Sequence, residues 1–367
     1  MRKLLVVLSL LIILFVGCDK KQESVTIGAL LPLTGKFAVY GNYMKQGLEV
    51  AYDDAVKNKT IDPKYVKLVI EDVKIDPKLA ISAYRKLKST TNLVAVLPVT
   101  SACTLAIKSI SNKDNVVMIN TTAISSEIED LDDYTFSVLA DAKLISKYLV
   151  KFALDKEKNN ASIIYRDDAS GVSIMNEFKK QFIAKGGNII LTEANKPSSF
   201  EFKNSISKLK DTNTSLVILA SFGTEVSKYL IQAKEMDYST QVMAYETFYS
   251  QKALDEAKGN AEGIIFPIPK FDVNSKKADV ETLRQKIKNK YNSDKIVFYT
   301  ATMYDGISLL FDAINQGNKS GNKIKKYIHN LESYEGITGK MSFREDGGII
   351  TDLIAITVKN DKFIELK

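Results

Sequence analysis

Few residues of this chain are of the types that carry catalysis or bind metals. The single histidine, His329, lies in the lysine-rich helical stretch KIKKYIHN, which is typical of a protein surface. One histidine nearly excludes His-based triads and His-rich metal sites, and the two cysteines lack metal-binding spacing. Asp168 and Glu246 could form a carboxylate pair for acid–base chemistry. Since no nucleophile–base pair and no phosphate-binding motif accompanies them, we expect a protein that is not an enzyme.

Glu246 directly follows the apolar stretch 242–245, which predicts a β-strand. It is therefore expected at the carboxyl end of a strand, the edge at which open α/β sheets bind ligands. The N-terminal part has the same arrangement. The apolar run Val25–Leu31 predicts a buried strand, Pro32 and Gly35 break it, and the apolar residues after Gly41 are spaced as in a helix. Both stretches predict ligand binding at a sheet edge.

Strands and helices alternate with short links, which predicts parallel sheets covered by helices on both faces. In a first block we expect strands at 25–31, 67–73, 93–97 and 116–119, and helices after Gly41, at 79–87 and from Ser101, the expected N-cap. In a second block we expect strands at 161–165, 188–191, 215–220, 242–245 and 263–266, and helices at 144–154, 172–184, 200–209 and 224–236.

Pro267 and Pro269 predict a crossing between two lobes. The later helices, at 280–291, 301–315 and 324–331, have no matching set of strands, so we expect them to return to the first block before a β-rich tail at 341–343 and 349–358. The predicted fold class is α/β, with two doubly wound parallel-sheet lobes joined by a multi-strand hinge. The expected boundaries are 25–140 with 268–347 for lobe 1, and 141–267 with 348–367 for lobe 2.

Residues 1–17 predict a signal peptide. Arg2 and Lys3 precede an apolar run, 4–16, which is shorter than the ~20 residues of a membrane-spanning helix. The segment Phe15-Val16-Gly17-Cys18 resembles the bacterial lipobox, which implies cleavage before Cys18 and attachment of lipid to it. Residues 18–24 would then be a tether. An uncleaved anchor and an ordinary secretory leader are the alternatives.

The formal charge of +7 would fall to +5 after cleavage, with 49 basic and 44 acidic residues. Basic and acidic residues are interspersed, which indicates a solvated surface and not a nucleic-acid-binding stripe. If Cys18 carries lipid, Cys103 has no partner for an intrachain disulfide. We expect Cys103 to be a buried packing residue.

Four short motifs resemble those of the type I periplasmic solute-binding proteins, in the leucine/isoleucine/valine-binding family of ABC transporters. The first is the opening stretch IGALLPLTGKFAVYGNYMKQGLEVA, and the others are Leu97-Pro98-x-x-Ser101, Asp167-Asp168-x-x-Gly171, and Ile337-Thr338-Gly339 followed by Phe343 and Asp346-Gly347. Each motif alone is weak evidence for the family. Together, in this order and at this spacing, the four motifs extend over essentially the whole mature length.

The resemblance implies that a small solute binds between two lobes, with no cofactor, no metal and no catalytic step. It places ligand-binding residues on both lobes: Tyr40, Ser101, Thr122 and Ile124 on the first, and Ser170, Phe222 and Glu246 on the second. Glu246 would bind the ammonium group of the ligand, Tyr40 and Phe222 would pack on it, and Ser101 at a helix start would receive its carboxylate. The alternatives are a solvated Glu246, core aromatics and a simple helix cap.

Two departures from the family pattern affect the expected ligand. Ile124 stands where the family places a threonine, so we expect only its amide to meet the head group. Ser170 replaces a tyrosine on the second lobe. Thr121 or Asp168 could compensate for the lost groups.

The resemblance implies a lipid-anchored solute-binding protein at the periplasmic or cell-surface face of the membrane. We expect it to act as a monomer, to capture an amino acid or a related amine, and to deliver it to an ABC permease. The alternative is a ligand sensor on the same scaffold, signalling to a membrane receptor. No nucleic-acid partner is expected.

Overall fold

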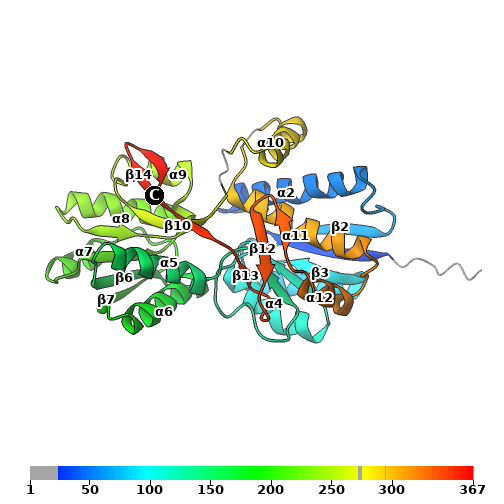
Figure 1. Cartoon of the computed structure of the whole chain (residues 1–367), viewed down its shortest axis with the longest axis horizontal. Coiled ribbons are helices and arrows are strands. Elements are labelled where there is room, and N and C mark those ends of the chain that lie inside the picture. Colours follow the sequence, from blue (N-terminus) through cyan, green and yellow to red (C-terminus); the bar gives the residue numbers. More distant parts are fainter. Residues whose placement is uncertain (1–23, 272–274, 294, 367) are drawn as a thin grey trace, which may run out of the picture.

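The computed structural model describes residues 24–271, 275–293 and 295–366. The predicted signal peptide and Cys18 lie outside this range. The chain forms two α/β lobes side by side (Figure 1). In the described part of the chain, every helix is too short or too polar to cross a lipid bilayer.

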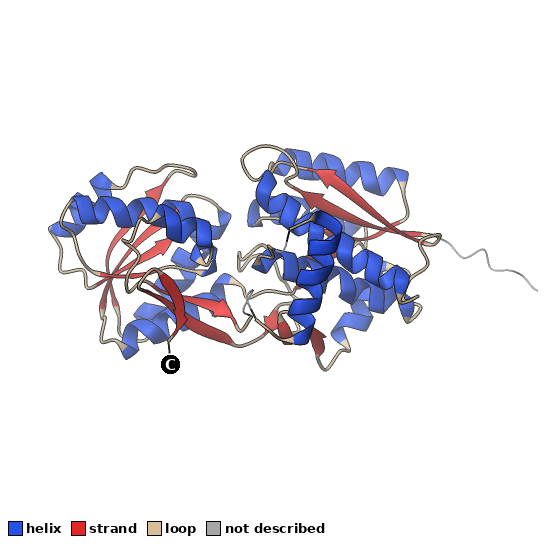
Figure 2. Ribbon diagram, turned by 90° about the horizontal axis from the view of Figure 1, so that it is seen from above, coloured by secondary structure: helices blue, strands red, loops and turns tan. Residues whose placement is uncertain are grey.

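Lobe 1 is built on a five-stranded parallel sheet. Its strand order is β2 (Val66–Asp72), β1 (Val25–Leu31), β3 (Leu93–Leu97), β4 (Val117–Asn120) and β5 (Thr135–Ser137). The helices of this lobe are α2 (Ala38–Lys57), α3 (Pro77–Thr90), α4 (Ser101–Lys113), α10 (Ala278–Tyr291), α11 (Phe298–Asn315) and α12 (Gly321–His329). Strands β1 and β3 are buried at every residue, as expected of strands covered on both faces. Figure 2 shows helices flanking both sheets.

Lobe 2 is built on a seven-stranded sheet. The order is β15 (Lys362–Glu365), β14 (Leu353–Lys359), β10 (Ile265–Pro269), β9 (Gln241–Met243), β8 (Leu216–Ala220), β6 (Asn160–Arg166) and β7 (Asn188–Asn195). Its helices are α5 (Ala142–Asp155), α6 (Ala169–Ala184), α7 (Lys203–Lys210), α8 (Gly223–Glu235), α9 (Gln251–Glu256) and the short 3-10 helix η1 (Glu246–Phe248). Neighbouring residues of a strand enter different cores, since Ile163 packs in one cluster and Ile164 in another. Both faces of this sheet are therefore buried.

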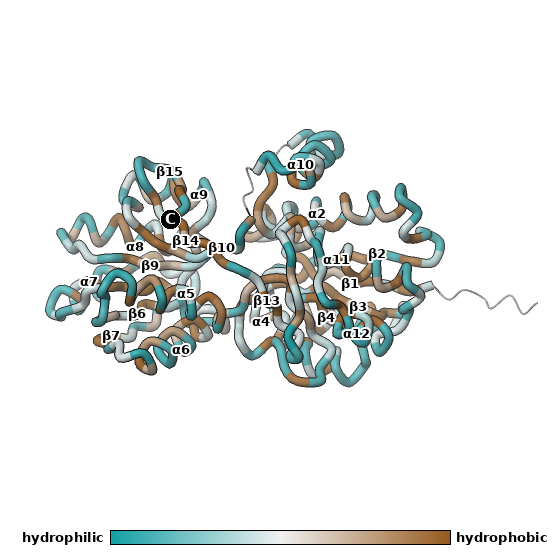
Figure 3. The backbone as a smooth tube through the Cα atoms, in the orientation of Figure 1, coloured by the Kyte–Doolittle hydropathy of each residue, from teal (hydrophilic) through white to brown (hydrophobic). Residues whose placement is uncertain are grey.

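The chain passes between the two sheets three times, between β5 and α5, between β10 and α10, and before β14. A small antiparallel sheet lies beside these passages, made of β11 (Tyr334–Gly336), β12 (Gly339–Phe343) and β13 (Ile349–Ile350). Figure 3 shows hydrophobic strands inside each lobe and hydrophilic segments around them. The predicted multi-strand connection is therefore present.

The predicted α/β class is confirmed, but the second sheet is mixed, because β14 runs antiparallel to both β10 and β15. Pro267 and Pro269 lie within β10, so the predicted crossing begins later than they indicate. The predicted strand 349–358 is interrupted between β13 and β14. Cys103 is fully buried, as predicted, and His329 is exposed.

Helices α2 and α11 approach so closely that one contact requires a glycine. A Cβ atom added at Gly47 of α2 would lie 2.1 Å from the carbonyl oxygen of Thr300 in α11. Backbone atoms cannot move aside as a flexible side chain can, so the helices would have to separate.

Replacing Gly47 by alanine is expected to lower the free energy of unfolding by about 1–3 kcal/mol, the usual cost of overpacking. Urea unfolding followed by circular dichroism measures this change. The exposed Asn42 on the same helix supplies the control. N42A should stay within about 0.5 kcal/mol of the wild type. A fully stable G47A protein would show that the two helices are not held at this distance.

A cluster of charged side chains connects lobe 1 to the start of α5. The Nη2 atom of Arg344 donates to Oδ2 of Asp141 at 2.7 Å, and Asp141 caps α5 by accepting from the Leu144 amide. Nearby, Glu129 is buried; its Oε1 accepts from the Ser137 hydroxyl, and its Oε2 has no partner among the described residues. Desolvation, with repulsion from Asp141, raises the pKa of Glu129 to about 7.

Replacing Glu129 by glutamine is expected to stabilise the protein at pH 8 and to have little effect at pH 5. The folded state holds the Glu129 proton up to about pH 7, whereas the unfolded state releases it near pH 4.5. Wild-type stability therefore falls as pH rises through this window, by roughly 3 kcal/mol at most. The glutamine variant lacks this loss, so its advantage should reach about 1–3 kcal/mol at pH 8.

Urea unfolding at pH 5, 6.5 and 8 measures this difference. The exposed neighbour Glu127 is the matched control, and E127Q should show no pH-dependent difference from the wild type. An E129Q protein whose stability differs from the wild type by the same amount at all three pH values would contradict this account of Glu129.

Candidate functional site

The start of α4 forms the polar edge of lobe 1. Thr100, in the left-handed region with φ 57°, occupies the N-cap position without a side-chain cap, and Ser101 is the first helical residue. The prediction that Ser101 is the N-cap is thus wrong by one residue. The Thr100 hydroxyl is buried without a hydrogen-bond partner among the described residues. An uncapped helix start offers backbone amides and a positive dipole end to an anion.

The hydroxyl of Ser101 holds the loop that follows β4. Its Oγ accepts from the amides of Ile124 and Ser125, both at 3.2 Å. Having accepted two hydrogen bonds, this hydroxyl keeps its own proton for donation to another group. Thr122 lies in the same loop, and its hydroxyl accepts from the Thr100 amide at 3.0 Å.

Ile124 offers less to a ligand than the sequence predicts. Its amide donates to Ser101, its carbonyl accepts from the Ala142 amide at 2.6 Å, and its side chain is buried in a lobe 2 core cluster. The amide that we expected to meet the head group is therefore engaged within the protein. Next to it, the Ser126 amide donates to the Ser173 hydroxyl of α6 at 2.9 Å and joins the two lobes.

Two tyrosines of lobe 1 are influenced by carboxylates of lobe 2. Tyr40, on α2, is half-buried against the lobe 1 core, and desolvation followed by the charge of Glu256 raises its pKa. Tyr299, at the start of α11, has a pKa raised by desolvation and then by the charges of Glu246 and Tyr40. Because carboxylates of lobe 2 raise both pKa values, these lobe 1 tyrosines lie within electrostatic reach of lobe 2. Sequence analysis did not identify Tyr299; its position at the start of a helix was the available signal.

The lobe 2 side includes the start of α6, where Ser170 is already engaged. Asp168 caps the helix, with Oδ1 accepting from the amides of Ser170 and Gly171, each at 3.1 Å, and from the Ser170 hydroxyl at 2.7 Å. Ser170 therefore binds Asp168 and has no free hydroxyl proton for a ligand. Asp168 was a candidate to compensate for the missing ligand-binding groups. In this arrangement its Oδ1 caps α6 instead.

Phe222 directly precedes α8, two residues after β8 ends, and is half-buried. The guanidinium of Arg166 lies over its ring, with Cζ at 4.4 Å from the ring centroid. The Phe222 amide donates to Oε2 of Glu225 at 3.1 Å. Arg166 is the last residue of β6, one residue beyond the strand predicted at 161–165.

Glu246 begins η1, three residues after the last residue of β9, and is partly exposed. Desolvation raises its pKa to about 8. In the described part of the chain no basic side chain pairs with its carboxylate. The hydroxyl of the adjacent Tyr245 is buried and has no hydrogen-bond partner among the residues that the structure describes. A desolvated carboxylate without a cation is well suited to receive one from a ligand.

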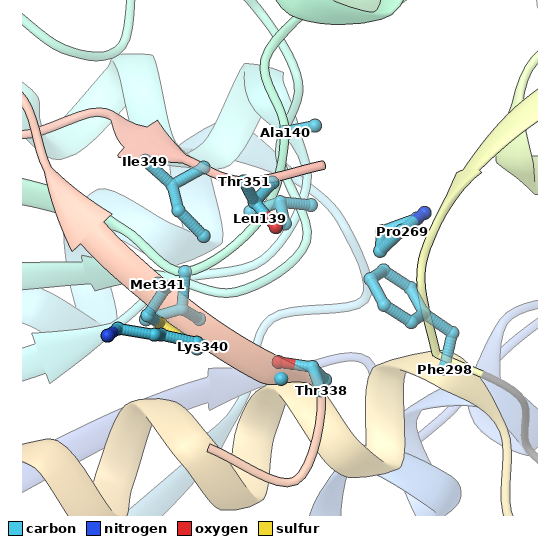
Figure 4. Close-up of a pocket in the computed structure, with 11 residues that line it drawn as sticks. Leu139, Ala140, Pro269, Phe298, Thr338, Lys340, Met341, Ile349 and Thr351 are labelled. Atoms are coloured by element: carbon cyan, nitrogen blue, oxygen red, sulfur yellow. The ribbon is translucent and has the colours of Figure 1, made fainter. Parts of the chain in front are cut away.

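A small cavity lies at the passages between the lobes, and Figure 4 shows Pro269 and Phe298 facing Leu139 and Thr351 across it. None of the seven predicted site residues lines this cavity. It is separate from the predicted site, although Phe298 is the neighbour of Tyr299. Among the described residues, no group of three or more His, Cys, Asp or Glu side chains could hold a metal ion.

Two α/β lobes, joined by three passages and carrying polar groups at the facing edges, define a two-lobed binding protein. Residues 24–362 match a family model described as periplasmic binding protein, and the chain belongs to this family. The family indicated by the four sequence motifs is thus confirmed.

The relatives are distant but match over most of the chain. A Leu/Ile/Val-binding protein homologue from Brucella abortus (strain 2308) is 23% identical over 319 residues, which cover 82% of this chain and 79% of that protein. A leucine-binding protein structure from Thermotoga maritima has a TM-score of 0.83 at 19% identity and covers 94% of this chain and 98% of its own. The structure of a branched-chain amino acid substrate-binding protein from Streptococcus pneumoniae, in complex with isoleucine, has a TM-score of 0.80 at 22% identity. The match covers 94% of this chain and 100% of that chain. These structures establish the fold.

Proposed function

We propose that the protein captures an amino acid or a related amine between its lobes and delivers it to an ABC permease. The observation that carries the proposal is Glu246, a desolvated carboxylate that lies near Tyr299 of the other lobe and has no basic partner in the described part of the chain. The uncapped start of α4, with the free proton of Ser101, is the proposed seat of the ligand's carboxylate. An ammonium at Glu246 and a carboxylate at α4 are the two charges of an amino acid.

The predicted site residues and the lobe boundaries remain proposals. We propose that Tyr40 and Phe222 contact the ligand, as does Tyr299. Thr122, Ile124 and Ser170 would act mainly by shaping the loops around it, since their described polar groups bond within the protein. Closure of the lobes on the ligand follows from binding, because both lobes touch the ligand only in the closed arrangement.

We also propose that residues 1–17 are removed and that lipid on Cys18 anchors the protein outside the inner membrane. Labelling with a fatty-acid analogue tests this: the wild type should carry label and C18A should not. A secretory leader without lipidation would leave both unlabelled. The sensor alternative uses the same cleft, and a deletion strain that takes up the ligand normally but loses a regulatory response would favour it.

Native mass spectrometry of protein purified without residues 1–18 tests the function directly by identifying a retained solute. A thermal-shift panel then compares L-leucine, L-valine, their amides and 4-hydroxybenzoate, which has no ammonium group. A ligand of the folded state stabilises it by about 2.7 kcal/mol at a hundredfold excess over Kd. We expect compounds with an ammonium group to raise the melting temperature. Stabilisation by 4-hydroxybenzoate alone would refute the proposal.

A further inference from the structure

Arg166 is an unusually buried arginine of lobe 2. It is the last residue of β6 and is only 7% exposed. Arginine is seldom buried so deeply unless other groups pair with it. Its Nε binds Oδ2 of Asp168 and its Nη1 binds Oε1 of Glu225, while its Cζ lies 4.4 Å from the Phe222 ring centroid. A lysine could not make these contacts together, because they require a planar, forked cation.

Each carboxylate that binds Arg166 also holds a different loop. Asp168 accepts from the amides of Ser170 and Gly171 and thus fixes the start of α6. Glu225 accepts from the Ser198 amide at 2.9 Å through Oε1 and from the Phe222 amide at 3.1 Å through Oε2. One guanidinium therefore connects three segments that follow β6, β7 and β8.

The charges at this position argue against Arg166 as a ligand contact. Its single positive charge is bound by two carboxylates, both on the same lobe, and Glu225 is 3% exposed. An anionic ligand group would meet net negative charge here. The guanidinium instead covers part of the Phe222 ring and, through Glu225, holds the Phe222 backbone.

We propose that Arg166 is a positioning residue that fixes the ring of Phe222 and ties it to the start of α6. This inference rests on the proposed function, in which Phe222 packs on the ligand. The exposed part of the ring would keep one orientation toward the cleft, and it would contact the side chain of the solute. Arg166 would then influence how strongly the protein distinguishes a large apolar side chain from a small one, without touching either.

The binding test compares the affinities for L-leucine and L-alanine by calorimetry. Losing an ordered aromatic contact costs about 0.5–1.5 kcal/mol, so the leucine-to-alanine affinity ratio should fall about 3- to 10-fold in R166M. The variant R166M/E225Q removes the cation and one of its partner charges together, and should show the same fall if R166M alone folds poorly. R166K, which keeps the charge but not the planar stack, should also lower the ratio.

A double-mutant cycle separates positioning from general destabilisation. In an F222A background, R166M should leave the leucine-to-alanine ratio unchanged, because the residue through which Arg166 acts is gone. A purely structural role would lower the melting temperature but leave the ratio unchanged in both backgrounds. Equal falls with and without Phe222 would also overturn the inference.

Hydrogen exchange tests the same network without a ligand. In R166M, peptides covering 169–171, 196–200 and 221–226 should exchange faster together, whereas a peptide from the lobe 1 strand Val117–Asn120 should not change. Faster exchange near 169–171 alone would refute the connection between the loops. If the wild type binds no amine, the proposed function fails, and the exchange result still decides whether Arg166 holds Phe222.

Discussion

Replacing Glu246 by alanine is expected, at pH 9 where its carboxyl group is mostly ionised, to weaken the binding of an ammonium-bearing solute at least 10-fold, and up to about 150-fold. A hydrogen bond to a charged group contributes ~1.5–3 kcal/mol, which corresponds to this range of affinity. The effect should be large because no basic side chain of the described chain competes for the carboxylate. The affinity of E246Q should lie between the affinities of the wild type and E246A, because glutamine keeps a hydrogen-bond acceptor but loses the charge.

Calorimetry with the solute identified by mass spectrometry measures the change. Glu201, an exposed glutamate of the same lobe, provides the matched control, and E201A should bind like the wild type. Circular dichroism shows whether each variant is folded. Unchanged affinity in a folded E246A protein would remove Glu246 from the site and with it the main support for an amine ligand.

The sequence predicted elements well where local pattern determines structure. Val25–Leu31 and Leu93–Leu97 are apolar runs bounded by turn residues, and both strands have the predicted bounds. The helix predicted at 79–87 lies within α3, which begins at Pro77, and the Asp76 side chain before it accepts from the amides of Lys78 and Leu79. These signals depend on residues within one turn of each other, so they can be read without knowing the tertiary structure.

Pairing between distant segments could not be read in this way. Pro267 and Pro269 indicated the end of a strand, yet both are accommodated in β10, which pairs with β14 nearly 90 residues later. The short strand β5 and the edge strand β15 were missed for the same reason. Each exists because a neighbouring strand supplies its hydrogen bonds.

In the candidate site, too, local features could be predicted from the sequence, whereas contacts between distant residues could not. The position of Glu246 after a strand was apparent from the sequence, but its lack of a basic partner was not. That Ser101 holds the loop at Ile124, and that Asp168 occupies the Ser170 hydroxyl, depends on side chains brought together by folding. Arg166 and Tyr299 were missed because their partners lie on other elements, and for Tyr299 on the other lobe.

The affinity for an ammonium-bearing solute is expected to rise several-fold, and by at most about 10-fold, between pH 6 and pH 7 and to level off above pH 8. Desolvation raises the Glu246 pKa to about 8, so its carboxyl group is mostly protonated at pH 6 and 7. Only the ionised form attracts an ammonium group, and its fraction grows about 10-fold for each pH unit below the pKa. Binding at pH 7 should therefore release nearly one proton.

Calorimetry in buffers with different ionisation enthalpies measures that proton directly, because the observed heat changes in proportion to the protons released. E246Q is the control: it cannot ionise at this position, so its affinity should be independent of pH between 6 and 8. Wild-type affinity that is constant over this range would show that Glu246 is already ionised in the unliganded protein. Binding of the ammonium group would then release no proton from Glu246. The inference that this carboxylate is desolvated would be wrong.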